Sequence, residues 1–350
     1  MERQSPRIAG SVLLGLVLGL LASGCGTEAP APVLTTSDGY LFCFWNVENL
    51  FDDYDDHRES KADREYDTWF AREHAALQLK LDHLSEALVK LNGGKGPDIL
   101  ALAEVESMRA AQLLQEALNQ RLDDPALHYE HVLMKDLSAG RHIAPAILTR
   151  LPVKKERTRL HGSGLRILEG HIEVNGHDLV VIASHWTSRV SDERGDRRGK
   201  YGDQIYGIFK GMWKSNPKVD LLVCGDFNDT PDSAAVRKHL RATGDLQAVL
   251  QPQADPSLYN LFADKEAGAG FGTHYYAGNW YIFDEIVVSP GLLDEEGWTC
   301  DRESVRTVNS LMRPGDKHRR PWRFGNERDS GQRGYSDHFP VTVRLRVQGS

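Results

Sequence analysis

The chain has 350 residues, of which 26% are charged, and a formal net charge of −8. A net negative charge argues against binding nucleic acid by overall electrostatic attraction. The length would accommodate two domains, but β-rich sandwiches of this length also form one, and the sequence after Ser37 shows neither a repeat nor a linker. We therefore expect a single folded domain over residues 39–348.

The N-terminus combines basic residues with a short apolar run. Arg3 and Arg7 precede residues 12–21, a run shorter than the roughly 20 residues that a membrane-spanning helix needs. This arrangement predicts a secretory signal peptide at residues 1–24 and an exported protein.

The end of this segment, Leu21-Ala22-Ser23-Gly24-Cys25, resembles a bacterial lipobox. The resemblance implies that Cys25 is lipidated and holds the protein at the cell envelope. Residues 25–38 are rich in Pro, Ala and Thr and would form the flexible linker to the membrane. An ordinary secretory signal that contains a cysteine is the open alternative.

The remaining cysteines, Cys43, Cys224 and Cys300, show no CxxC spacing, which argues against a structural zinc site. Cys43 and Cys224 sit inside apolar runs, so buried free thiols are expected there. A disulfide in an exporting compartment stays open.

In chain order, short apolar runs predict buried strands at residues 40–45, 98–102, 143–148, 179–183, 220–224, 281–288 and 339–347. Asn175-Gly176 predicts a type I′ hairpin turn between residues 171–174 and 178–182. Leucines three and four residues apart predict a helix over residues 77–91, and residues 107–118, 204–213 and 233–240 suggest further helices. Strands mixed with helices indicate an α+β fold, an α/β sandwich of layers.

Polar side chains follow the strands where they end or, near the C-terminus, precede the final strand. Each alone has an ordinary explanation, such as a turn, a solvated side chain or a satisfied core histidine. Together they form an oxygen-rich set with few imidazoles, which suits Mg²⁺, Mn²⁺ or Ca²⁺ better than Zn²⁺. The set comprises Asn46, Glu48, Glu104, His185, Asp226, Asn228, Asp337 and His338.

Four segments resemble the signature blocks of the endonuclease/exonuclease/phosphatase superfamily, the deoxyribonuclease I-like fold. They occur in the family order and span nearly the whole domain: Trp-Asn-Val-Glu-Asn at 45–49, Pro-Asp-Ile-Leu-Ala-Leu-Ala-Glu at 97–104, Gly-Asp-Phe-Asn at 225–228 and Ser-Asp-His-Phe-Pro at 336–340. The resemblance implies two stacked, largely antiparallel β-sheets flanked by helices, with the site at one edge of the sandwich.

The resemblance also implies a metal centre that holds Mg²⁺, or alternatively Mn²⁺ or Ca²⁺. Glu104 would be the principal ligand, with Asn46, Glu48 and Asp337 in or beside the same coordination sphere. Asp226 and Asn228 match the pair that positions water and binds phosphate.

Two histidines match catalytic positions of the family. His338 corresponds to the acid/base histidine, and Asp284 falls where the family places the carboxylate that orients it. Glu285 is the competing candidate, but strand alternation puts only one of the two on the site face. His185 resembles the second active-site histidine of the deoxyribonuclease I branch.

Basic residues surround these positions in the sequence. Arg141 or His142 occupies the stretch where relatives carry a phosphate-contacting residue, although the Tyr of the apurinic-endonuclease branch is absent. Residues 189–200 hold five basic and three acidic side chains, and residues 313–333 hold seven and three. The second segment leads into His338, so its cations would raise the local concentration of anions, or would simply be solvated. Within it, Trp322 and Phe324 would either stack on bases or anchor the loop.

These features predict a metal-dependent phosphoester hydrolase, most simply an extracytoplasmic nuclease-type phosphodiesterase whose partners are nucleic acid and, through the lipid anchor, a membrane. A sphingomyelinase-like lipid-headgroup hydrolase and a small-phosphoester hydrolase are the alternatives, although no exposed apolar hairpin is evident. A non-catalytic surface-binding lipoprotein is the alternative from another class.

Overall fold

The computed structural model describes residues 39–137, 140–162, 164–251, 254–268 and 271–349. The predicted signal peptide, the linker and Cys25 lie outside the described residues. Within the described ranges, no helix combines the length and apolarity needed to cross a bilayer.

Two large sheets form the centre of the domain. The first has the strand order β14-β15-β1-β2-β4-β3 and the second the order β5-β6-β7-β8-β13-β10-β9, while β11 and β12 form a separate ribbon. The strands are β1 Tyr40–Leu50, β2 Ile99–Val105, β3 His131–Met134, β4 Ala144–Thr149, β5 Arg159–His161, β6 Ile167–Val174, β7 His177–His185, β8 Asp220–Asp226, β9 Ala242–Thr243, β10 Leu258–Asn260, β11 His274–Tyr276, β12 Asn279–Tyr281, β13 Asp284–Val288, β14 Trp298–Thr307 and β15 Val341–Val347.

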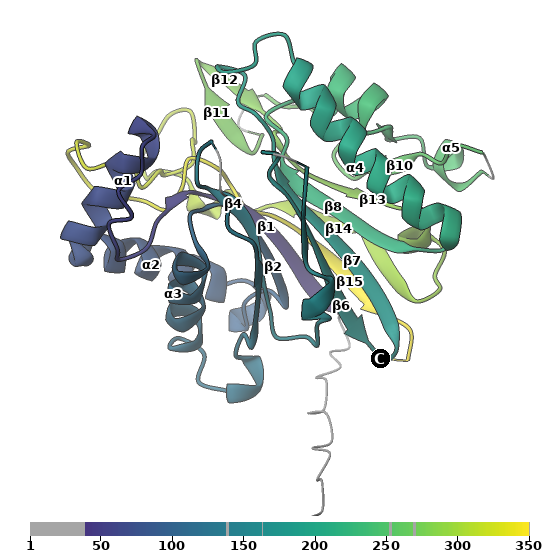
Figure 1. Ribbon diagram of the computed structural model, residues 1–350, viewed down its shortest axis with the longest axis horizontal. Coiled ribbons are helices and arrows are strands. Elements are labelled where there is room, and N and C mark those ends of the chain that lie inside the picture. Colours follow the sequence, from purple (N-terminus) through teal and green to yellow (C-terminus); the bar gives the residue numbers. More distant parts are fainter. Residues whose placement is uncertain (1–38, 138–139, 163, 252–253, 269–270, 350) are drawn as a thin grey trace, which may run out of the picture. The chain divides into compact units, whose positions relative to one another are not determined.

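Helices cover the outer faces of the sheets (Figure 1). They are α1 Lys61–Arg72, α2 His74–Val89, α3 Met108–Asn119, α4 Asp196–Ser215 and α5 Leu246–Leu250, with a π-helical turn η4 at Ala235–His239. α1, α2 and α3 lie over the first sheet and α4 over the second. The predicted sandwich of two sheets flanked by helices is confirmed. The sheets are mixed, because β1–β2, β7–β8 and β9–β10 pair in parallel.

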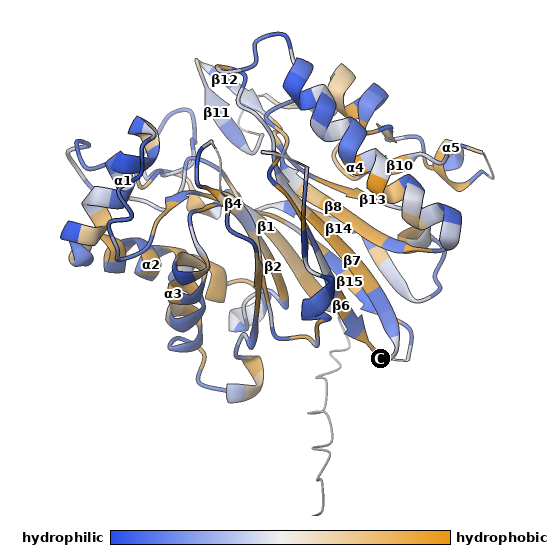
Figure 2. Ribbon diagram, viewed as in Figure 1, coloured by the Kyte–Doolittle hydropathy of each residue, from blue (hydrophilic) through white to orange (hydrophobic). Residues whose placement is uncertain are grey.

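The core follows the alternation of the strands. In β1, Cys43, Trp45 and Val47 pack with the helices, whereas Phe42 and Phe44 point to the opposite face and are fully buried. Apolar residues run along the strands inside both layers (Figure 2). Burying each such side chain contributes about 1.5–3 kcal/mol.

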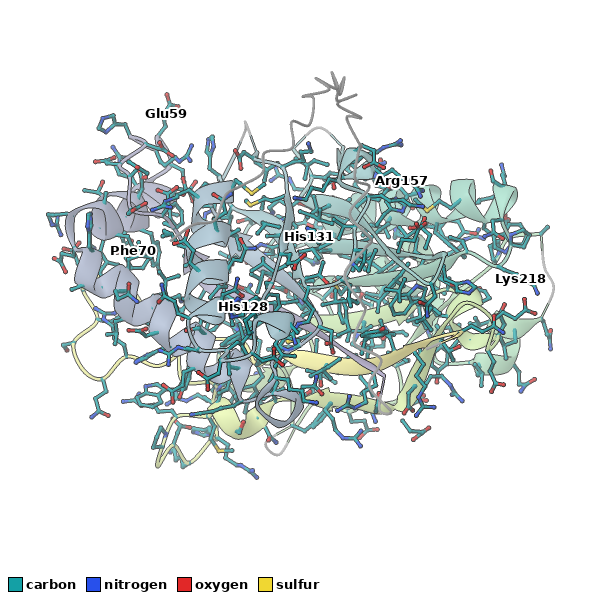
Figure 3. All side chains as sticks on the ribbon, turned by 90° about the horizontal axis from the view of Figure 1, so that it is seen from below. Glu59, Phe70, His128, His131, Arg157 and Lys218 are labelled. Carbon is teal, nitrogen blue, oxygen red and sulfur yellow. The ribbon has the colours of Figure 1, made fainter. Side chains whose placement is uncertain are left out.

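Polar residues face outward around this core. Glu59 and Lys218 are exposed and project at opposite ends of the domain, whereas Phe70 is fully buried among the helices (Figure 3). Cys43 and Cys224 are buried free thiols, as predicted, and so is Cys300.

Two predicted elements have different limits. The strand predicted at 281–288 is divided between β12 and β13, because the N–H groups of Phe283 and Asp284 both donate to Thr273 Oγ1 instead of continuing one ladder. The helix predicted at 204–213 begins at Asp196, because Asp192 accepts hydrogen bonds from the N–H groups of Arg197 and Arg198 in its first turn. Part of the basic loop predicted at 189–200 is therefore helical.

Helix α1 was not predicted, although its apolar spacing is visible in the sequence. Tyr66, Trp69 and Phe70 lie at helical spacing and are buried against the first sheet. By contrast, the hairpin predicted at Asn175-Gly176 is confirmed, with positive φ angles of 53° and 81° and the pair Val174–His177 closing it.

Candidate active site

Three neighbouring strands of the second sheet place polar side chains in one row at its edge. β7 and β8 run parallel with His185 opposite Asp226, and β13 runs antiparallel to β8 with Asp284 opposite Asp226. Directly paired residues point to the same face of a sheet. The register of the three strands therefore brings these side chains together, and all of them are buried.

His338 meets this row from the first sheet, just before β15. Its Nδ1 donates to Asp284 Oδ2 at 2.8 Å, and its Nε2 lies 3.7 Å from Asp226 Oδ2. Burial alone would lower the pKa of His338, but the carboxylates of Asp284 and Asp226 outweigh it and hold the pKa well above its ordinary value. His338 is therefore an imidazolium near neutral pH.

The other members of the row respond to the same burial. Desolvation, with the negative charge of Asp284 adding to it, raises the pKa of Asp226 to about 7. Burial and the nearby cations Arg166 and Arg141 hold the pKa of His185 well below its ordinary value. His185 is therefore neutral, and its Nδ1 has no hydrogen-bond partner among the described residues.

The backbone beside the row is strained. Four non-glycine residues have positive φ angles, which cost on the order of 1–3 kcal/mol each and cluster at functional sites. They are Glu48 at 52°, Asn49 at 57°, Glu104 at 65° and Asn228 at 48°. The pairing of β1 with β2 is also irregular between Asn46 and Leu50, which re-aims the side chains that follow β1.

Asn46 ties two carboxylates together. Its Nδ2 donates to Glu104 Oε1 at 3.3 Å and to Asp226 Oδ2 at 3.0 Å, and its Oδ1 accepts the N–H of Glu48. Glu104 also accepts the N–H of Asn49 at 2.9 Å. Glu104 is only partly buried, so it keeps acceptor capacity toward solvent.

Glu48 is turned away from this group. Its carboxylate accepts from Arg323 Nε at 2.8 Å and from the N–H groups of Phe324 and Gly325. Desolvation, together with the charge of Asp337, raises the pKa of Glu48 to about 7. In this arrangement Glu48 anchors the segment 313–333, and its predicted role as a metal ligand competes with Arg323.

A cavity of about 910 Å³ opens over these residues. Its acidic lining includes Glu104, Asp226 and Asp337. Its basic lining is larger and comes from segments far apart in the sequence: Arg141, Arg166, Arg197, Arg313, Arg320, Arg323 and Arg333. A buried acidic and imidazole centre in a cavity lined by guanidinium groups suits an anionic substrate.

The family comparison agrees with this geometry. The model of the endonuclease/exonuclease/phosphatase family matches residues 41–347. The chain belongs to this family. Members of the superfamily are phosphoester hydrolases.

Solved structures show the same fold at low sequence identity. An endonuclease/exonuclease/phosphatase family protein from Bacteroides thetaiotaomicron is 15% identical with a TM-score of 0.52, and the match covers 88% of this chain and 97% of that one. Beta toxin from Staphylococcus aureus, a mutant solved with bound magnesium ions, is 16% identical with a TM-score of 0.51 and coverages of 87% and 99%. The chain matches no curated protein.

Most of the predicted site residues of this family member lie around the cavity. Its lining includes Glu104, His185, Asp226, Asn228, Asp337, His338 and Arg141. Asp284 and Asn46 stand directly behind this lining, where they contact His338 and Asp226. Glu285, the competitor of Asp284, points the other way and bonds Asn260 Nδ2 at 2.5 Å.

The two phosphate-contact candidates differ in position. Arg141 lines the cavity and is held by Asp63, whose Oδ1 accepts from its Nε at 2.7 Å. His142 is not part of the described lining: its N–H donates to Asp63, and its Nδ1 lies 3.1 Å from Arg58 Nη1. The geometry thus favours Arg141 over His142 as the substrate contact.

Loop 313–333 is fastened by Phe324, and the ammonium group of the buried Lys80 lies over the ring of Phe324. Phe324 is 2% exposed and packs with Trp69 and Phe70, so it anchors the loop rather than stacking on bases. Lys80 is fully buried, and its Nζ donates to the carbonyls of Glu48 at 3.0 Å and Tyr335 at 3.2 Å.

Lys80 and His274 were not predicted as site residues from the sequence. Lys80 lies three residues after Leu77 and four before Leu84, on the buried face of α2, so a charged residue on an apolar stripe was its signal. His274 lines the cavity from β11 with its ring stacked on His338, the centroids 4.1 Å apart. No motif marked it.

Proposed function

We propose that this chain is a divalent-metal-dependent phosphodiesterase of the nuclease type, exported and lipid-anchored through Cys25. The observation that carries the proposal is the contact of His338 with Asp284 and Asp226 at the base of an arginine-lined cavity. An imidazolium held between two carboxylates is suited to contact a phosphate oxygen and to exchange a proton there.

The proton roles follow from the positions of the groups. His338 binds a non-bridging oxygen of the scissile phosphate through Nε2, while Asp284 fixes its tautomer and orientation. Asp226, with its pKa raised to about 7 by burial, accepts the proton of the attacking water. His185 is neutral and faces the same cavity, where it contacts the leaving oxygen, and the proton that Asp226 takes from the water passes to that oxygen through solvent.

The donor set fits a hard divalent cation. Glu104 and Asp337 are carboxylates that line the cavity, and Asn46 holds Glu104 in place. Oxygen ligands of this kind suit Mg²⁺ or Mn²⁺, which would offset the charge of the phosphate and lower the pKa of a bound water. The magnesium in the similar beta toxin supports this assignment.

Nucleic acid is the favoured substrate because the cationic lining exceeds what one phosphate needs. Seven arginines surround the cavity although the whole chain carries a charge of −8. Such a local field attracts a polyanion that the protein as a whole would repel.

A second candidate, hydrolysis of lipid headgroups, has one observation in its favour. The ribbon β11–β12 beside the cavity carries Tyr276 with 51% of its surface exposed, an aromatic side chain able to contact a lipid surface.

The purified protein should be assayed on plasmid DNA, bis-p-nitrophenyl phosphate, p-nitrophenyl phosphate and sphingomyelin vesicles, with Mg²⁺, Mn²⁺ and Ca²⁺ in turn. We expect metal-dependent cleavage of DNA and the diester, lost with a chelator and in His338→Ala. Cleavage of sphingomyelin alone would replace the nuclease by the lipid hydrolase, and a folded protein inactive on all four would indicate a binding role.

The anchor is tested separately in cells. Radiolabelled palmitate should be incorporated into the wild-type chain and not into Cys25→Ser. Equal labelling of both would refute lipidation at Cys25.

A further inference from the structure

His274 is fixed in one tautomer by its neighbour. Its Nδ1 lies 2.9 Å from the backbone carbonyl oxygen of Asp337, which only accepts hydrogen bonds, so Nδ1 carries the proton. The neutral ring then presents the Nε2 lone pair as a bare acceptor. His274 lines the cavity, and among the described residues nothing donates to this nitrogen.

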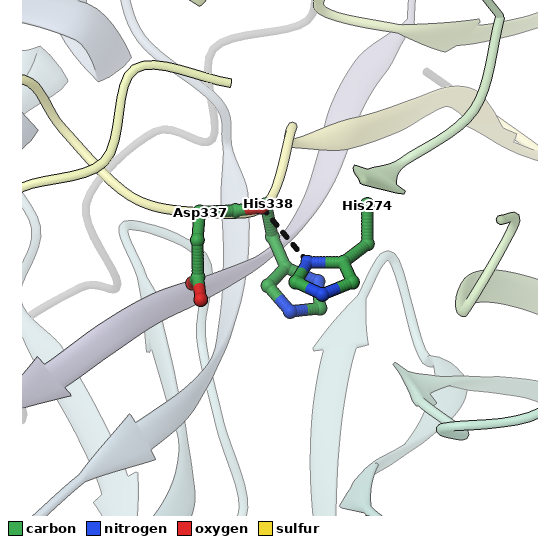
Figure 4. A group of neighbouring side chains, drawn as sticks. All are labelled: His274, Asp337 and His338. Atoms are coloured by element: carbon green, nitrogen blue, oxygen red, sulfur yellow. Dashed lines mark hydrogen bonds between the residues drawn. The ribbon is translucent and has the colours of Figure 1, made fainter. Parts of the chain in front are cut away.

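The carboxylate of Asp337 faces the same space. No side-chain or backbone donor of the described residues bonds it, whereas Glu48 and Asp284 both have donors. One ligand atom each from His274, Asp337 and His338 lie within 4.8 Å of one another. Figure 4 shows both imidazole rings and the Asp337 carboxylate extending to the same side. Two acceptors that lack donors and line the same cavity favour a cation between them.

The backbone holds His274 firmly in this position. His274 and His338 form an isolated bridge, and their rings stack with an interplanar angle of 26°. A metal-binding histidine characteristically donates its other N–H to a carbonyl or carboxylate, which orients the ring. His274 has this arrangement with Asp337, whereas His338 donates its Nδ1–H to Asp284 and keeps Nε2 for the phosphate.

We propose that His274 Nε2 is a nitrogen ligand of the divalent metal, paired with the carboxylate of Asp337. The proposal rests on the metal-dependent function in taking Asp337 as a ligand. Water and phosphate oxygens would complete the coordination sphere, as at many metal sites of phosphoryl-transfer enzymes. An imidazole ligand shifts preference toward transition metals, so Mn²⁺ should bind more tightly than Mg²⁺ or Ca²⁺.

Two substitutions separate the two nitrogens of the ring. His274→Asn keeps an amide donor near the position of Nδ1 and removes Nε2. His274→Gln reaches the position of Nε2 with an amide group and removes the Nδ1 donor. His185→Asn and His338→Asn, which each remove another imidazole of the cavity, are the matched controls.

Binding of Mn²⁺ to the full-length protein should be measured by electron paramagnetic resonance, with pulsed detection of nitrogen-14 coupling. We expect coupling in the wild type and in both controls, and none in His274→Asn or His274→Gln. Affinity should fall at least roughly 10- to 100-fold in His274→Asn, since that is the loss when even the partners behind a ligand are removed. His274→Gln should bind more tightly than His274→Asn, because its amide oxygen can replace the nitrogen.

Persistence of the coupling in the two His274 variants, or its absence from wild type with Mn²⁺ bound, would overturn the proposal. Hydrolysis of bis-p-nitrophenyl phosphate with Mn²⁺ is measured on the same samples. Hydrolysis without nitrogen coupling would leave the proposed function intact and refute the His274 ligand. Nitrogen coupling without hydrolysis of any phosphoester would support the His274 ligand and refute the proposed function. Thermal unfolding shows whether each variant is folded. If one His274 variant is misfolded, the nitrogen coupling of the other His274 variant decides whether the proposal holds.

Discussion

Two histidines of the described residues lie between carboxylates, His171 in the second sheet and His338 just before β15 of the first sheet, and only His338 faces the active-site cavity. His171 on β6 lies between Glu169 and Asp178, with both ring nitrogens 3.0 Å from a carboxylate oxygen. The outer oxygen of Glu169 is also bonded by His161 at 2.7 Å. His338 instead has one bond at 2.8 Å and a second carboxylate at 3.7 Å.

The two regions differ in how many of their polar atoms have hydrogen-bond partners. Both ring nitrogens of His171 and all four carboxylate oxygens of Glu169 and Asp178 have hydrogen-bond partners, so this network stabilises the fold. At the active site, Asp284 Oδ1 and His185 Nδ1 have no partner among the described residues, and Asp337 faces open space. Buried groups left unsatisfied cost stability, and substrate or metal can satisfy them. A histidine between carboxylates is therefore not by itself a catalytic signature.

The largest expected effect is loss of activity in Asp284→Asn. The change keeps the size of the side chain but removes the charge that holds the His338 imidazolium, so kcat/KM should fall about 10²- to 10⁴-fold, the range of general acid–base catalysis. Glu285→Gln, one residue further on the opposite face, should keep its activity. Equal losses in both variants would show that the effect is structural, and steady-state kinetics with a circular-dichroism check distinguishes the cases.

The opposite result is expected for His171→Leu, which should lower the free energy of unfolding and leave kcat/KM unchanged. Removing one partner of a buried ion pair typically costs about 3–5 kcal/mol. Here Glu169 retains His161 and Asp178 retains Arg157, so we expect about 2–3 kcal/mol, mostly from the lost hydrogen bonds. Urea unfolding measures the loss, and an unchanged kcat/KM on the diester is the accompanying result. A hundredfold loss of kcat/KM in a folded variant would contradict the comparison.

The stabilisation by this network should depend on pH in a defined window. Burial alone would lower the pKa of His171, but the hydrogen bonds that its ring donates to Asp178 and Glu169 raise the pKa, so its contribution is lost as pH rises through the folded-state pKa. Burial would raise the pKa of Glu169, but His161 and His171 lower it to about 2, so its contribution is lost as pH falls toward 2. The difference between wild type and His171→Leu should be largest between about pH 4.5 and 6.5.

Urea unfolding at pH 3, 5.5 and 9 checks this window. A difference in unfolding free energy that is equal at all three values would mean that the charges of the network do not contribute.

The sequence carried most of the information about the two sheets and the row at their edge. The strand-end residues Asn46, Glu104, His185 and Asp226 follow strongly apolar strands, and the family blocks fix their order, so their convergence was predictable. The family resemblance pointed to Asp284, strand alternation allowed only one of Asp284 and Glu285 on the site face, and the structure shows the Asp284 contact with His338.

The rest depends on contacts between distant segments. Glu48 is bound by Arg323, 275 residues later, and His274 reaches His338 from a ribbon that carries no motif. A local pattern cannot report such a partner, because the neighbour of a side chain is set by how loops cross the sheets. Only Lys80 left a local trace, a charge on the apolar face of α2.

The smallest expected effect concerns the arginines that line the cavity. Unlike the groups around His171, only some of these arginines have a partner. Arg320 and Arg323 are bound by Asp316 and Glu48, whereas the exposed guanidinium groups of Arg197 and Arg313 have no hydrogen-bond or ion-pair partner among the described residues. If the substrate is a polyanion, its phosphate groups would bind the guanidinium groups of Arg197 and Arg313.

Replacing both free arginines, in Arg197→Ala/Arg313→Ala, should raise KM for DNA about 3- to 10-fold with kcat unchanged, since each exposed ion pair contributes up to about 1 kcal/mol. The effect should shrink at high salt, because surface charges are screened beyond about 3 Å at 1 M. KM for bis-p-nitrophenyl phosphate, which has one phosphate, should change little. Arg194→Ala, outside the described lining of this cavity, is the control for loss of positive charge. A salt-independent rise in KM for both substrates would show instead that the arginines shape the scissile site, and the polyanion argument would fail.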